Sequence, residues 1–154
     1  MDECCDASVP DTPQSRLCAA CGQAGRTVGL ITLKALLRPA ALERLSVGDH
    51  YFCATAACPV VYFGAGDVFP HEDVLVPVFQ KEPPGRRTVC YCFDVGEDQV
   101  RAEVETTGAS VSAERITGLV RDERCACELR NPQGGCCLGN VRAIARSALG
   151  APVA

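Results

Sequence analysis

The twelve cysteines constrain this chain more than any other feature, because they fall into six close pairs. Only two histidines accompany them. Two sets of four thiolates can be assembled from the later pairs, with two cysteines to spare and two more near the N-terminus. This arrangement predicts two metal centres, a zinc site and an iron–sulfur cluster. In chain order the pairs are Cys4-Cys5, Cys18-x2-Cys21, Cys53-x4-Cys58, Cys90-x-Cys92, Cys125-x-Cys127 and Cys136-Cys137.

A disulfide framework is the alternative, since the number of cysteines is even. The sequence begins Met-Asp-Glu-Cys-Cys-Asp, which has neither the basic region nor the apolar run of a secretory signal. The C-x-C and C-C pairs are too close to bridge internally without strain, although they can bridge outward. We therefore expect a cytoplasmic protein whose reduced thiols bind metal.

Composition excludes two other classes of partner. The formal net charge is -4, so the chain lacks the basic footprint of a nucleic-acid-binding protein. It has three tyrosines, five phenylalanines and no tryptophan, which leaves few rings for base stacking. No apolar stretch approaches the ~20 residues of a membrane-spanning helix, so no membrane insertion is expected.

The pattern along the chain predicts an α+β protein made of two small units. Residues 1–15 are acidic and predict a flexible tail. Residues 16–82 predict a small β-rich unit, and residues 88–150 predict a small helical unit. Residues 83–87 form the linker, within the proline- and glycine-containing segment 81–87. Units of this size need a staple such as a metal ion.

In the first unit we expect short strands near residues 27–31, 50–53, 59–63 and 74–80. Residues 32–37 either continue the first strand or form a helical turn before Pro39, and residues 40–45 form a turn or short helix. In the second unit we expect helices near 97–106, 113–121 and 138–149. Gly108 is the expected stop of the first helix and Ser112 the expected cap of the second.

Four cysteines of the first unit have the spacing of a structural zinc site. Cys18-x2-Cys21 places two thiolates on one tight turn, and Cys53 and Cys58 supply two more from a loop between strands. Four thiolates suit a closed tetrahedral zinc site. His50 and Asp49 lie beside Cys53 and remain alternatives for one ligand, although His50 is better explained as a strand or surface residue.

The cysteines of the second unit suit an iron–sulfur cluster. Cys90-x-Cys92 places successive thiolates on a loop just before a helix. The loop from Cys125 to Cys137 precedes the last helix, whose N-terminal N–H groups can stabilise an anionic cluster. Six cysteines compete for four places here, so spacing alone leaves the ligand set open.

Two sequence strings resemble a known family. Val89-Cys-Tyr-Cys-Phe93 and Cys127-Glu-Leu-Arg-Asn-Pro-Gln-Gly-Gly-Cys-Cys137 resemble the BFD-like 2Fe–2S ferredoxin domain. With the Cys18-x2-Cys21 motif, Tyr51-Phe-Cys53 and Cys58-Pro-Val-Val-Tyr-Phe63, they are similar to the N-terminal domain of CopZ-type copper chaperones. This resemblance covers nearly all of residues 16–149.

The resemblance implies a zinc subdomain followed by a cluster domain. The implied zinc ligands are Cys18, Cys21, Cys53 and Cys58. The implied 2Fe–2S ligands are Cys90, Cys92, Cys127 and Cys137, with Cys136 as the alternative to Cys137. Cys125 matches no ligand position in the family, so it is a spare thiol, or a labile copper or thiol-exchange site.

The resemblance also implies a role in metal homeostasis. Such a protein would bind a thiophilic ion such as Cu(I) and donate single electrons, for example to reduce Cu(II). Its partners would be a copper-transporting ATPase, a separate small copper-binding protein or a redox protein. It is not expected to be a conventional enzyme.

One departure from the family puts copper delivery by the usual route in doubt. Full-length chaperones carry a further copper-binding domain with an M-x-C-x-x-C loop, whereas Met1 is the only methionine here and Cys18–Cys21 the only C-x-x-C. The pair Cys4-Cys5, in the expected flexible tail, either captures a soft ion or has no specialised role. The alternative hypothesis is an electron-transfer module with no copper role.

Overall fold

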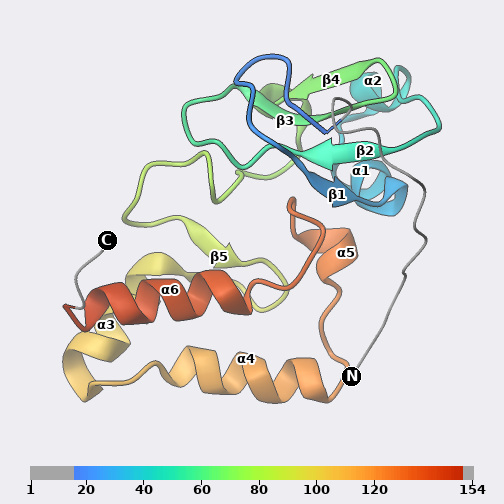
Figure 1. Cartoon of the computed structure of the whole chain (residues 1–154). Coiled ribbons are helices and arrows are strands. Elements are labelled where there is room, and N and C mark those ends of the chain that lie inside the picture. Colours follow the sequence, from blue (N-terminus) through green and yellow to red (C-terminus); the bar gives the residue numbers. More distant parts are fainter. Residues whose placement is uncertain (1–15, 151–154) are drawn as a thin grey trace.

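The computed structural model describes residues 16–150, and its N-terminal half is built on a small antiparallel sheet (Figure 1). Aromatic and β-branched residues fill the central strands, which are buried along almost their whole length. The strand order is β1-β2-β3-β4, so each strand pairs with its neighbour in sequence. The strands are β1 (Arg26–Val28), β2 (His50–Phe52), β3 (Val60–Gly64) and β4 (Asp67–Pro70).

Two helices and a 3-10 turn complete this half. Residues 32–36 belong to a helix, α1 (Leu30–Leu36), rather than to a continued strand, and Leu37 follows the helix in an extended conformation. Pro39 begins α2 (Pro39–Leu42), a position where its missing N–H costs nothing. The 3-10 turn η1 (His71–Asp73) follows β4.

The predicted strand over residues 74–80 is wrong. Val74 forms only an isolated bridge with Leu37, and bends and turns follow it. Val74 and Val78 are both buried in the core, so the segment buries its apolar side chains without a strand ladder. Pro77 cannot donate to a ladder, and the Val78 carbonyl accepts from the N–H groups of Lys81 and Glu82 in a turn.

The C-terminal half is mainly helical. It begins with a short hairpin, β5 (Thr88–Cys90) and β6 (Val95–Gly96). The three predicted helices are confirmed as α3 (Glu97–Thr107), α4 (Val111–Arg121) and α6 (Leu138–Ala148). The structure adds a short helix, α5 (Cys127–Arg130), that the sequence did not indicate.

The predicted end of α3 is confirmed, whereas the predicted cap of α4 is wrong. Gly108 has φ 80° and ends α3 in the left-handed conformation, as expected. Ser112 does not cap α4, because the cap lies two residues earlier, where the Ser110 side chain accepts from the Ala113 N–H at 3.0 Å. Ser112 instead donates to the Glu103 carboxylate at 2.6 Å.

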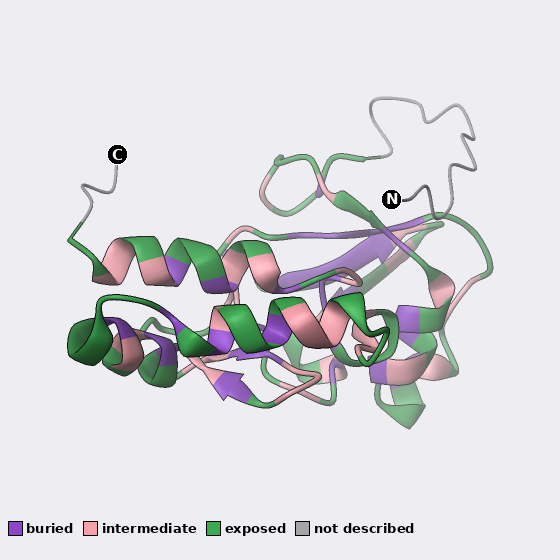
Figure 2. Ribbon diagram, turned by 90° about the horizontal axis from the view of Figure 1, so that it is seen from below, coloured by how far each residue is buried: buried purple, intermediate pink, exposed green. Residues whose placement is uncertain are grey.

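Each half has its own main apolar core, and Figure 2 shows the buried and exposed stripes of the C-terminal helices. The predicted α+β class, a sheet-based half followed by a helical half, is thereby confirmed. None of the helices within residues 16–150 is long and apolar enough to cross a membrane. The first core centres on Leu33, Phe52, Val61, Tyr62 and Phe69, and the second on Val89, Val95, Val100, Ile116 and Val141.

The two halves are joined by more than the chain itself. The buried Tyr62 hydroxyl donates to the Pro132 carbonyl at 2.6 Å, and Gln80 donates to the Gln133 side chain at 2.6 Å. Helix α5 packs on α1. Because these contacts hold the loop between α5 and α6, the first half supports the loop that carries Cys136 and Cys137.

Candidate metal centres

The first pair of thiols lies on a tight turn before β1. The Gly22 N–H donates to the Cys18 carbonyl at 2.7 Å, and the Cys18 N–H donates to the Gln23 carbonyl at 2.9 Å. Gly22 has φ 75°, which glycine adopts without strain. This turn directs the side chains of Cys18 and Cys21 to the same side.

The second pair comes from the loop between β2 and β3. The Cys53 N–H donates to the Val61 carbonyl at 2.8 Å, so the loop is anchored on the sheet. The Cys58 N–H donates to the Thr55 carbonyl at 3.1 Å, which closes the loop as a turn. The predicted loop between strands is therefore confirmed.

All four thiols meet at one point, where their sulfur atoms lie within 4.8 Å of one another. The Cys18–Cys58 separation is 3.8 Å and the Cys21–Cys53 separation is 3.7 Å. Four thiolates at about 2.3 Å from a zinc ion lie about 3.8 Å apart, so the arrangement fits a tetrahedral ion. Three of the four are buried, which gives a closed site of the structural zinc type.

The surroundings of this site shift the pKa values of its thiols in opposite directions. Burial raises the pKa of the Cys18 thiol, and it raises that of Cys58 to about 12. A hydrogen bond with Thr55 Oγ1 at 3.4 Å lowers the pKa of Cys21 to about 6. A divalent ion would deprotonate all four, since metal-bound thiols ionise.

Lys81 is a contact of this site that the sequence did not reveal. Its ammonium group lies 3.6 Å from Cys53 Sγ and donates to the carbonyls of Thr55 and Cys58 at 2.7 and 3.0 Å. The only sequence signal was a lysine opening the linker. In the structure the Lys81 side chain binds the loop that runs from Cys53 to Cys58. Its positive charge offsets part of the negative charge of the thiolates.

His50 is not a ligand, although sequence reasoning left it open. Its two ring nitrogens lie 2.9 Å from the Gly48 carbonyl and 2.9 Å from Asp67 Oδ2. It is buried in β2 as a strand residue. Asp49 is exposed and also lies outside the group of four thiols.

The second set of cysteines gathers where β5, α5 and α6 meet. Cys90 ends β5, Cys92 lies in the following turn, Cys127 begins α5 and Cys137 directly precedes α6. The sulfur atoms of Cys92 and Cys127 are 3.7 Å apart. Cys90 and Cys137 form a second, buried pair joined by a hydrogen bond.

The ionisation of these thiols reflects the pairing. A hydrogen bond from Cys137 lowers the pKa of the Cys90 thiol to about 6, and the same bond raises the pKa of Cys137. Burial and the nearby Cys92 sulfur raise the pKa of Cys127. The Ala126 N–H donates to Cys92 Sγ at 3.2 Å.

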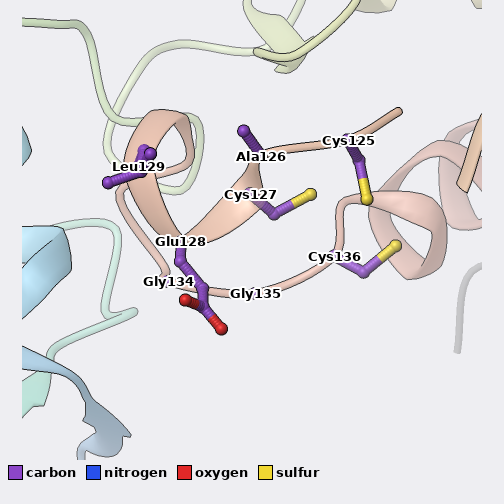
Figure 3. A pocket seen from close by; sticks show the side chains of 8 residues that line it. All are labelled: Cys125, Ala126, Cys127, Glu128, Leu129, Gly134, Gly135 and Cys136. Carbon is purple, nitrogen blue, oxygen red and sulfur yellow. The ribbon is translucent and has the colours of Figure 1, made fainter. Parts of the chain in front are cut away.

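Cys136 and Cys137 are adjacent in sequence but differ in surroundings. Cys137 is buried against Cys90, whereas Cys136 is exposed. Together with Cys125 and Cys127, Cys136 lines a hollow formed by residues 125–129 and 134–136 (Figure 3). The remaining candidates, Cys4 and Cys5, lie outside the described residues.

Comparison with known proteins agrees with this geometry. Residues 15–75, which include all four cysteines of the first site, match the model of the CopZ-type zinc binding domain. The chain is also 32% identical over 120 residues to the copper chaperone CopZ of Archaeoglobus fulgidus, an alignment that covers 78% of this chain and 57% of the relative. The chain therefore spans little more than half the length of that relative.

A solved structure supports the same assignment. The X-ray structure of the Archaeoglobus fulgidus CopZ N-terminal domain superposes with a TM-score of 0.67 at 29% identity. The match covers 89% of this chain and 99% of the solved domain. The predicted similarity to the N-terminal domain of CopZ-type chaperones is confirmed.

Proposed function

We propose that this chain, which is similar to the N-terminal domain of a copper chaperone, is a metal-homeostasis protein that binds a thiophilic ion such as copper. The observation that carries the proposal is the convergence of two separate sets of thiols, one in each half of the fold. A copper-transporting ATPase or a separate small copper-binding protein would receive the ion, and a redox protein would supply electrons.

The first set would hold zinc as a structural ion. The 3.7 and 3.8 Å sulfur separations support this occupant, and four thiolates leave no open position for catalysis. Cys18, Cys21, Cys53 and Cys58 would be the ligands. The ion would fasten the turn before β1 to the loop between β2 and β3.

The second set would hold a 2Fe–2S cluster on Cys90, Cys92, Cys127 and Cys137. Each iron of such a cluster takes two protein ligands, and the thiols here already stand in two pairs. The 3.7 Å contact supports Cys92 and Cys127 as one pair, and the buried hydrogen bond supports Cys90 and Cys137 as the other. When bound, the cluster would supply one electron at a time.

The choice between the adjacent cysteines is directly testable. Cys137→Ser should abolish the visible absorbance of the cluster, because it removes a buried ligand beside Cys90. Cys136→Ser should leave that absorbance unchanged, since Cys136 is exposed. The opposite pattern in the anaerobically purified variants would reverse the assignment.

Copper reduction separates the proposal from its rival, an electron-transfer module without a copper role. The cluster-loaded protein, reduced and desalted under anaerobic conditions, is mixed with Cu(II) and a Cu(I)-specific chelator. We expect about one more Cu(I) per chain than in a control sample whose cluster is oxidised. The control measures the copper that the thiols alone reduce. No difference between the two samples would favour the rival.

A further inference from the structure

Cys125 and Cys136 are used by neither proposed centre, yet they lie together beside one of them. They line the hollow of about 340 Å³ that also contains the Cys127 side chain. Figure 3 shows the three sulfur atoms pointing toward the same space from the start of α5 and from the loop before α6. The hollow is therefore a second thiol-lined space, and Cys127 belongs both to it and to the proposed cluster site.

The two spare thiols are accessible from solvent. Cys136 is exposed and Cys125 is half-buried, and neither belongs to an apolar core. Ala126, Gly134 and Gly135 line the hollow together with Glu128 and Leu129, whose side chains point away from the three sulfur atoms in Figure 3. Cysteines in such positions bind metal or react, whereas buried structural cysteines are inert.

The loop that carries Cys136 is held firmly. The Leu138 N–H donates to Cys136 Sγ at 3.5 Å, and Gln133 Nε2 donates to the Cys136 carbonyl at 2.9 Å. Asn131 Nδ2 donates to the Gly135 carbonyl at 2.8 Å. A site of this kind loses little entropy on binding an ion, because its backbone is already ordered.

We propose that Cys125 and Cys136 bind one Cu(I) ion at the mouth of this hollow. Soft thiolates favour Cu(I), and two are sufficient ligands for it. The two thiols release two protons as the ion binds. The carboxylate of Glu128, on the rim of the hollow, adds negative charge that attracts cations.

This inference rests on the proposed function and gives the copper a place. An ion held by Cys125 and Cys136 lies next to Cys127, a proposed cluster ligand, so an electron would travel only a short way between cluster and copper. The first thiol set is a poorer place for a transient ion, because three of its four cysteines are buried.

The test is a Cu(I) titration of the zinc- and cluster-loaded full chain under anaerobic conditions. A Cu(I) acetonitrile complex is added against a competing colorimetric chelator. All proteins carry Cys4→Ser and Cys5→Ser, which removes the other spare pair. We expect about one Cu(I) per chain held against the chelator, and at least a tenfold weaker affinity after Cys125→Ser and Cys136→Ser are added.

X-ray absorption at the copper edge should show two sulfur neighbours. Equal Cu(I) affinity in the two proteins would overturn the proposal. So would four sulfur neighbours together with release of zinc, because the ion would then have entered the first thiol set. Cluster absorbance and melting temperature verify that the added substitutions leave the fold and the cluster intact.

The site and the proposed function can fail separately. If the protein holds Cu(I) through Cys125 and Cys136 but its reduced cluster leaves Cu(II) unchanged, the site stands and the redox role fails. If the cluster reduces Cu(II) but Cu(I) binds equally without the two thiols, the redox role stands and the site is wrong.

Discussion

Replacing Glu97 by Gln should lower the thermal stability of the protein by more than any exposed substitution on the same helix. Glu97 is fully buried at the start of α3. Its Oε2 accepts from Arg87 Nε at 2.7 Å and from the Gly85 N–H at 2.8 Å, and its Oε1 accepts from Arg101 at 3.1 Å. These bonds tie the segment before β5, and hence Cys90, to α3.

The size of the effect follows from the ionisation of the carboxyl group. Burial alone would raise its pKa, but the hydrogen bonds from Arg87, Gly85 and Arg101 outweigh burial and lower the pKa from 4.5 to about 2. This difference corresponds to at most about 3 kcal/mol, reduced by solvent screening at Arg101. The contribution is fully present above about pH 4.5 and is lost as the pH falls toward 2.

The assay is thermal unfolding of the metal-loaded protein at pH 7, followed by circular dichroism. About 3 kcal/mol corresponds to a decrease of about 6–12 °C in a chain of this size. Glu105→Gln, an exposed substitution on α3, is the control and should change the melting temperature little. Equal melting temperatures of the two variants at pH 7, or a difference that persists unchanged in acid, would contradict this role of Glu97.

Three further changes test the contacts around the two centres. Gly134→Ala should destabilise the protein by about 1–3 kcal/mol and lower cluster occupancy, because φ is 73° and the added Cβ would lie 2.8 Å from Val28. The control is Gly135→Ala, whose added Cβ meets no atom within 4 Å and should change neither stability nor occupancy. Lys81→Met should speed zinc release to a chelator, whereas Lys34→Met on the exposed side of α1 should leave it unchanged. Tyr62→Phe should lower the free energy of unfolding in urea by about 1–3 kcal/mol, because the Pro132 carbonyl loses its buried donor. An unchanged urea midpoint would show that this contact between the halves is not stabilising.

The sequence predicted the parts of the fold whose signals are local. The three long helices were recognisable from apolar spacing, and Gly108 marked the end of α3. The segment 74–80 was misread because buried Val74 and Val78 alternate as they would in a strand, although the backbone there turns. Packing against the core, rather than a ladder of hydrogen bonds, decides its conformation.

For the candidate sites too, the sequence predicted what depends on local spacing and missed what depends on distant contacts. The spacing of the cysteines was sufficient to group Cys18 and Cys21 with Cys53 and Cys58, and the structure brings these four together. Spacing was not sufficient to separate Cys136 from Cys137. Their surroundings depend on where α6 begins and on the contacts that hold the preceding loop, and these involve residues far away in sequence.

The burial of Glu97 had no sequence signal either. A glutamate in the first turn of a helix is common on exposed surfaces, where its negative charge interacts favourably with the helix dipole. Here the chain folds Arg87 and the Gly85 backbone over it, so the charge is buried with its partners. Such a network follows from the path of the linker, which local sequence does not specify.

The most direct test of the two-centre account is the metal content of protein purified without oxygen. Iron, acid-labile sulfide and zinc are measured per chain on one sample. A chain that holds both centres should contain about two irons, two sulfides and one zinc. A well-folded protein with zinc but neither iron nor sulfide would contradict it, and the cysteines at 90, 92, 127 and 137 would then require another role.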